Sequence, residues 1–104
     1  MKENFSYEQK IKYYQGRKDN KSLTFGQRKY AKSFLAGAED SIVAWGKECN
    51  VGVPKAEYEK CLSNEIEIQE KFYKTCDESP SYKAYGYGTI LAKKELLRRS
   101  QRDE

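Results

Sequence analysis

The chain has 104 residues, of which 38% are hydrophobic and 35% charged, and it carries a formal net charge of +4. Its length suits one domain with a single core, so we expect residues 1–104 to form one domain with frayed ends at residues 1–5 and 101–104. No apolar run approaches the roughly 20 residues that span a bilayer, and the amino-terminal residues lack the hydrophobic stretch of a secretory signal, which predicts a soluble cytoplasmic protein without membrane contact.

A capping-box pattern predicts the start of the first helix. Ser6 is followed three residues later by Gln9, so each side chain can satisfy an unpaired N–H at a helix start near Tyr7. The next residues recur at spacings of four and three and form one apolar stripe: Tyr7, Ile11 and Tyr14. Gly16 accepts a left-handed conformation at low cost, so we predict that the helix ends there and that a charged loop follows.

The same capping pattern recurs at Thr24 and Gln27 and predicts a second helix from about Phe25. A long apolar stripe then continues at spacings of three and four: Ala31, Phe34, Ala38, Ile42 and Trp45. We therefore expect one long helix, with Gly37 as a position where it can bend. Turn residues at 50–52 end it.

Residues 54–76 are predicted to be helical, either as one long helix or as two pieces. Pro54 suits a first helical position, and Ser63 or Asn64 offers a second helix start. The stretch EIEIQ at 65–69 alternates like a strand. Because the surrounding residues are helix formers, we favour a helix there as well.

Pro80 breaks the chain again, and a last helix is predicted from about Ser81 to Ser100. Its stripe has spacings of four, three and four: Tyr85, Thr89, Ala92 and Leu96. Gly86 and Gly88 each cost on the order of 1 kcal/mol relative to alanine inside a helix, so they either delay the helix start or allow close approach by another helix or a ligand. The expected fold class is all-α, a small bundle of four or five antiparallel helices.

The residue types exclude several kinds of catalytic and metal site. Histidine is absent, which rules out histidine-based triads, imidazole zinc sites and Glu-x-x-His metal sites. Cys49, Cys61 and Cys76 form no CxxC pair, so we expect reduced thiols rather than disulfides or a zinc site. The glutamates between 57 and 70 are interleaved with polar residues as on a solvated helix face. We therefore expect no enzymatic activity, no metal and no cofactor.

Charge is distributed unevenly along the chain. Residues 1–35 carry nine Lys or Arg against three acids, residues 36–80 five against ten, and residues 81–104 six against three. The first segment predicts a nucleic-acid-binding surface on a loop and the helix after it, with these candidate residues: Arg17, Lys18, Lys21, Arg28, Lys29 and Lys32. Tyr13, Tyr14 or Phe25 could stack on exposed bases, and the free N–H groups at the helix start would suit a phosphate. The alternative is that these cations only form the solvated exterior of the helices and bind no nucleic acid.

A second hypothesis is recognition of a protein or nucleoprotein partner, because Tyr and Arg are favoured anchors of interfaces. Its candidate residues are Tyr82, Tyr85, Tyr87, Arg98 and Arg99. The alternative is that the Tyr rings lie half-buried around a small core. The small size, the excess of Lys over Arg and the lack of enzyme motifs are similar to those of phage or mobile-element accessory and inhibitor proteins, although no alignable motif carries this similarity. We expect a non-enzymatic binding protein, with protein or nucleoprotein recognition slightly ahead of direct nucleic-acid binding.

Overall fold

The computed structural model describes residues 6–48 and 52–102. Within these ranges it contains four helices and no strand: α1 (Tyr7–Lys18), α2 (Phe25–Glu48), α3 (Lys55–Thr75) and α4 (Pro80–Arg102). The predicted all-α fold class is confirmed, and the four helices pack together as a bundle does; a fifth helix is not found in the described ranges. Of the expected frayed ends, 1–5 and 103–104 lie outside the described residues, whereas 101 and 102 continue α4.

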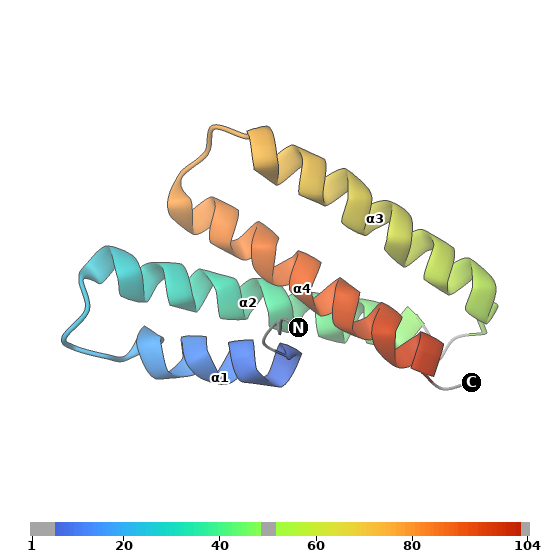
Figure 1. The fold of residues 1–104 in the computed structure, drawn as a ribbon, viewed down its shortest axis with the longest axis horizontal. Coiled ribbons are helices and arrows are strands. Elements are labelled where there is room, and N and C mark those ends of the chain that lie inside the picture. Colours follow the sequence, from blue (N-terminus) through green and yellow to red (C-terminus); the bar gives the residue numbers. More distant parts are fainter. Residues whose placement is uncertain (1–5, 49–51, 103–104) are drawn as a thin grey trace, which may run out of the picture.

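The helices α2 and α4 form the central pair of the bundle (Figure 1). The first helix packs mainly on α2, and α3 packs on α4. Figure 1 shows consecutive helices running in opposite directions, so that α2 and α4 run in the same direction. Near the starts of both, Tyr30 and Pro80 line one cleft, and near their ends the Nζ of Lys93 lies 5.5 Å from the ring centroid of Trp45. The expected antiparallel arrangement therefore does not describe the central pair.

Both predicted capping boxes are present. In the first, the Gln9 N–H donates to Ser6 Oγ at 3.2 Å and the Ser6 N–H to Gln9 Oε1 at 2.8 Å. Thr24 and Gln27 exchange the same pair of bonds at the start of α2. These bonds satisfy donors that a helix start leaves unpaired, which is why the two starts were predictable.

The predicted end of the first helix at Gly16 is wrong, because α1 continues to Lys18 and is capped at Asp19. Arg17 and Lys18 favour this extension, since cations are stabilised beside the carbonyl end of a helix. A Cβ added at Gly16 would meet nothing within 4 Å, so no packing contact requires glycine there.

The third region is one continuous helix, so neither a break near Ser63 nor a strand at 65–69 is found. Pro54 occupies the N-cap position rather than the first helical position. The last helix starts at Pro80, with the Tyr82 N–H donating to Ser79 Oγ, and it passes through Gly86 and Gly88 without a late start. Of the predicted turn, only Gly52 lies within the described residues, with a φ of 89° that favours glycine; positions 50 and 51 lie outside them.

Close backbone contact explains the small residues in the central pair. A Cβ built on Gly37 would lie 2.1 Å from the carbonyl oxygen of Tyr85, and one on Gly88 would lie 2.1 Å from that of Phe34. Four alanines line the same pair and are fully buried: Ala31, Ala38, Ala84 and Ala92. Of the two roles considered for Gly88, close approach by another helix is the one observed, and Gly37 has the same role.

Larger side chains fill the space between this pair and α3. One cluster holds Tyr58, Leu62 and Leu96, with Ile42 and Trp45 packed against it, and a second holds Ile66, Tyr73 and Ile90. The stripe predicted for α2 therefore faces the interior, its first three members buried and its last two half-buried. By contrast, none of the residues of α1 is fully buried, and its predicted stripe is only half-buried.

Candidate nucleic-acid and partner interfaces

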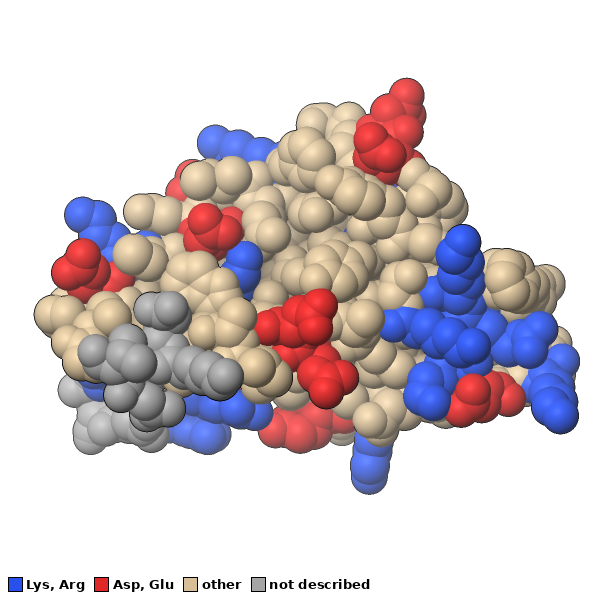
Figure 2. Space-filling view, turned by 180° about the vertical axis from the view of Figure 1, so that it is seen from behind, with Lys and Arg blue, Asp and Glu red and all other residues tan. Residues whose placement is uncertain are grey.

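The six predicted nucleic-acid-binding residues gather at one end of the molecule, which we call the basic end: Arg17, Lys18, Lys21, Arg28, Lys29 and Lys32. They lie in the last turn of α1, in the turn that follows, and in the first turns of α2. Figure 2 shows Lys and Arg side chains crowded over this end, on the right of the view. The residues lie in one region because a short turn joins the two helices that carry them.

One carboxylate, that of Asp19, lies among these cations. A hydrogen bond from Lys18 Nζ to Asp19 Oδ2, 2.8 Å long, lowers the pKa of the Asp19 carboxyl, and the charges of Lys18, Lys32 and Arg28 lower it further. Asp19 is the one carboxylate between residues 17 and 32. Within the described chain, Arg28 Nε is buried without a hydrogen-bond partner, which leaves one donor of this guanidinium unsatisfied.

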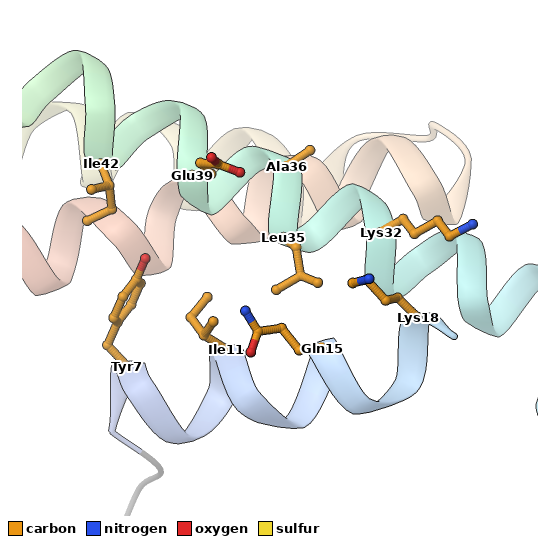
Figure 3. A pocket seen from close by; sticks show the side chains of 9 residues that line it. All are labelled: Tyr7, Ile11, Gln15, Lys18, Lys32, Leu35, Ala36, Glu39 and Ile42. Carbon is orange, nitrogen blue, oxygen red and sulfur yellow. The ribbon is translucent and has the colours of Figure 1, made fainter. Parts of the chain in front are cut away.

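A groove of about 540 Å³ runs between α1 and α2, and Lys18 and Lys32 of the basic end are among the residues that line it. Figure 3 shows Lys18 and Lys32 at one end of it and Tyr7 and Ile42 at the other. Between them the walls are largely apolar, formed by residues such as Ile11 and Leu35. The groove shows that α1 is packed incompletely on α2, in agreement with the half-buried stripe of α1.

The aromatic residues expected to stack on bases differ in accessibility. Phe25 is 72% exposed and Tyr13 is 49% exposed. Tyr14 is instead engaged inside the bundle, with its ring stacked on Phe34 at 4.2 Å between centroids. The Arg17 guanidinium lies over the Tyr13 ring, 5.2 Å from its centroid, so a cation–π contact joins a cation of the basic end to an exposed ring.

The three tyrosines that we predicted to bind a partner are all exposed but make different contacts. Tyr82 and Tyr87 flank the ring of Tyr73, at centroid distances of 5.8 and 6.1 Å. The Tyr85 hydroxyl donates instead to Asp40 Oδ2 of α2 at 2.6 Å. This hydrogen bond, with burial and the charge of Asp40 adding to it, raises the pKa of Tyr85. Tyr85 belongs to the predicted stripe of the last helix but is 39% exposed.

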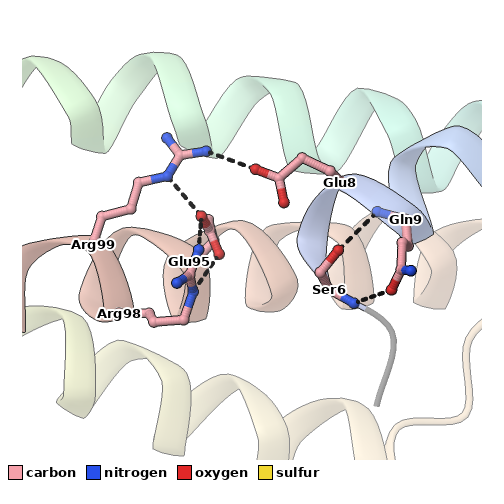
Figure 4. A network of polar contacts seen from close by, with 6 residues as sticks. All are labelled: Ser6, Glu8, Gln9, Glu95, Arg98 and Arg99. Carbon is pink, nitrogen blue, oxygen red and sulfur yellow. Dashed lines mark hydrogen bonds and ion pairs between the residues drawn. The ribbon is translucent and has the colours of Figure 1, made fainter. Parts of the chain in front are cut away.

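Arg98 and Arg99 lie at the far end of α4 and already hold an internal partner (Figure 4). Both hydrogen-bond the carboxylate of Glu95, Arg98 through two bonds of 2.9 and 2.7 Å and Arg99 through one of 2.7 Å. Glu8 of α1 also reaches Arg99, at 3.9 Å. Burial of Glu95 alone would raise its pKa, but the hydrogen bonds and charges of the two arginines hold the pKa below its ordinary value.

Two buried charged residues of α4 were not predicted from the sequence. Glu95 is 4% exposed, and Lys93 is 5% exposed. The Nζ of Lys93 donates to Gln69 at 2.7 Å and pairs with Glu65 at 3.2 Å, which ties α4 to α3. A signal was available, because Lys93 follows Thr89 by four residues along the buried stripe.

Two of the glutamates between residues 57 and 70 form ion pairs, and the cysteines of the described residues are free thiols. Glu67 pairs with Lys71, and Glu70 pairs with Lys94. Cys61 is exposed and Cys76 half-buried, both as free thiols, while Cys49 lies outside the described residues. Among residues 6–48 and 52–102, no group of His, Cys, Asp and Glu side chains could hold a metal ion, and no helix has the length and apolar character needed to cross a membrane.

Comparison with models of known families, with curated proteins and with solved structures finds no match for this chain.

Proposed function

We propose that this chain is a non-enzymatic binding protein that contacts nucleic-acid phosphates through its basic end. The observation that carries the proposal is that Lys18, Arg28 and Lys32 share one region of the fold with a single carboxylate, Asp19, which accepts a hydrogen bond from Lys18 at 2.8 Å. Six cations against one acid leave a surplus of positive charge in a small region. Phosphate groups of a nucleic acid would displace counterions from such a surface, which is the main source of sequence-independent affinity.

The geometry supports this hypothesis better than it supports the predicted partner surface. Its six residues lie on one end of the molecule, and Lys21 and Lys29 there are exposed. The partner residues are divided instead between separate regions, and Arg98 and Arg99 would have to leave Glu95 to bind anything else. Breaking such a buried, charge-assisted set of hydrogen bonds is costly.

The test is equilibrium binding to a labelled oligonucleotide over a series of salt concentrations. We expect the logarithm of affinity to fall linearly with the logarithm of salt concentration. Reversing two exposed cations, as Lys29→Glu with Lys32→Glu, should reduce binding at low salt at least about tenfold. The matched control reverses two exposed lysines of α3, as Lys60→Glu with Lys71→Glu, and should weaken binding far less. Equal reductions in both variants, or no binding at low salt, would contradict the proposal.

Recognition of a protein or nucleoprotein partner, as in phage-type accessory proteins, is the second candidate function. Exposed apolar surface favours it: Ile68 is 63% exposed, Phe72 one turn later is 48% exposed, and Tyr82 is 45% exposed. Phe72 and Tyr82 both pack against Tyr73 across α3 and α4. In a pull-down from a cognate extract, Phe72→Ala with Tyr82→Ala should lose a captured protein that nuclease treatment does not release. Unchanged capture would remove this surface from consideration.

A further inference from the structure

A second cleft is lined by α1 residues that differ from those that line the groove of Figure 3. Its volume is about 480 Å³, and three tyrosines and one arginine give it its chemical character: Tyr13, Tyr14, Tyr30 and Arg17. Unlike the groove of Figure 3, it is lined by the exposed Tyr13, with the Arg17 guanidinium over the Tyr13 ring. A flat ring next to a fixed cation is the arrangement that single-strand-binding proteins use to hold a base and a phosphate.

A larger cleft, of about 760 Å³, is lined by residues of all four helices. Phe34 and Tyr87 lie in its walls. Tyr14 of the 480 Å³ cleft stacks on Phe34 of the larger cleft at 4.2 Å, and Tyr30 lies 6.1 Å from Tyr14, so the linings of the two clefts are in contact at these rings. Tyr87 is 37% exposed there and offers a second ring surface.

The rim of the larger cleft is cationic. Lys10 comes from α1, Lys74 from α3 and Lys94 from α4, against one carboxylate, Glu70. Glu70 is already paired with Lys94 at 2.6 Å. Within residues 6–48 and 52–102, neither Lys10 nor Lys74 takes part in an ion pair, so both charges are available to a phosphate.

We infer that the two clefts form the path of a single-stranded nucleic acid, with bases stacked on Tyr13 and Tyr87 and phosphates held by Arg17, Lys10 and Lys74. This inference rests on the proposed function and names its substrate class. A paired base cannot offer its face to a protein ring, so a duplex gains only the phosphate contacts. The protein is therefore expected to prefer single strands, even though its basic end attracts either form.

The decisive experiment compares three probes of equal length at one fixed salt concentration: an oligothymidine strand, an abasic strand with the same phosphates, and a duplex. Stacking of one base contributes about 1–3 kcal/mol, which corresponds to roughly 5- to 150-fold in affinity. We expect the wild-type protein to bind oligothymidine at least about tenfold more tightly than the abasic strand. An oligouridine strand and an abasic ribose strand are compared in the same way, to decide whether the ligand is DNA or RNA. Tighter binding of either base-carrying strand than of its abasic counterpart supports the inference.

Tyr13→Ala should lower oligothymidine affinity toward that of the abasic strand and leave abasic binding unchanged. The matched control is Phe72→Ala, because Phe72 is 48% exposed, close to the 49% of Tyr13, and lines neither cleft. Lys10→Ala with Lys74→Ala should reduce the salt slope by about 0.7 for each phosphate that the variant no longer binds, whereas Lys60→Ala with Lys71→Ala should leave the slope unchanged.

The two proposals fail in different ways. Equal affinity for base-carrying and abasic strands, with Tyr13→Ala unchanged, would overturn the single-strand path and leave the proposed function standing. Loss of all binding in the Lys29→Glu, Lys32→Glu protein, together with a normal preference for bases in the wild type, supports both. Absence of binding to every probe at low salt would overturn both.

Discussion

Glu95 shows how a charged side chain is accommodated inside a small helical protein. Its side chain is 3% exposed, while the side chains of Arg98 and Arg99 are 49% and 42% exposed. The arginines therefore bring their charge to a buried acceptor and keep much of their own hydration. Three hydrogen bonds from the arginines replace the hydrogen bonds to water that the buried carboxylate loses. Arg99 also pairs with Glu8, which connects the network to α1.

We predict that Glu95→Gln lowers the free energy of unfolding by about 1–2 kcal/mol at neutral pH, since water partly screens the two arginines. The folded-state pKa of Glu95 lies below its ordinary value of 4.5. Its stabilising contribution is therefore fully present above that value and is lost as pH falls through the folded-state pKa. Denaturant unfolding between about pH 6 and pH 3 should show a shallower loss of stability in the variant than in the wild type. Parallel pH profiles would contradict this assignment.

At the scale of elements, the contact between α2 and α4 depends on the absence of side chains. Gly37 and Gly88 lie against backbone oxygens of the opposite helix, and a rigid backbone cannot move aside as a flexible side chain can. The glycines weaken each isolated helix. Their cost is offset by close packing of two long helices, with buried alanines on either side of the crossing.

Substitution of these glycines should distinguish the contribution of helix packing to stability from the contribution of helix propensity. Gly37→Ala and Gly88→Ala are each expected to lower the free energy of unfolding by about 1–3 kcal/mol or more, because the added methyl group forces the helices apart. Gly16→Ala is the matched control in an open helical position, where a gain of about 0.5–1 kcal/mol is expected. Thermal unfolding followed by circular dichroism measures all three. A stabilised Gly88→Ala protein would show that the helices are not in close contact at that point.

At the scale of the whole molecule, the fold separates two kinds of surface. The basic end lies at the turn between α1 and α2, and the arginines of the last turns of α4 lie at the opposite end, where they are partly neutralised by Glu95 and Glu8. Exposed aromatic surface on α3 and α4 is carried by Phe72 and Tyr82. The net charge of +4 is therefore not spread evenly over the surface. A region of concentrated charge attracts phosphates more strongly than the net charge alone would suggest.

Ligand binding to the folded state should raise thermal stability by mass action. At a single-strand concentration of about 100 times Kd, the stabilisation is about 2.7 kcal/mol, which corresponds to a rise of about 10 °C or more in Tm for a chain of this size. The Lys29→Glu, Lys32→Glu protein should show the same Tm without nucleic acid and little rise with it. An equal rise in both proteins would place the bound strand away from the basic end.

Local physical chemistry explains what could be predicted from the sequence. The capping boxes at Ser6 and Thr24, the stripe from Ala31 to Trp45 and the all-α class depend on residues within a few positions of one another, and the structure confirms them. The end of α1 was misplaced because Gly16 permits a left-handed conformation without requiring it. The proximity of the cations at the basic end was predictable for the same local reason, since a short turn joins the two helices that carry them.

Contacts between distant segments were decided only by the tertiary structure. The sequence by itself determined which regions are helical, though not the end of α1 or the continuity of α3, and which stripe of α2 is apolar. It did not determine that α2 and α4 run in the same direction, that Lys93 and Glu95 are buried, or that Lys10 and Lys74 border one cleft. These features depend on which helix faces pack together. An apolar spacing of three or four residues predicts the buried face of one helix, but not the helix against which that face packs. The backbone contacts of Gly37 and Gly88 select that partner in this protein.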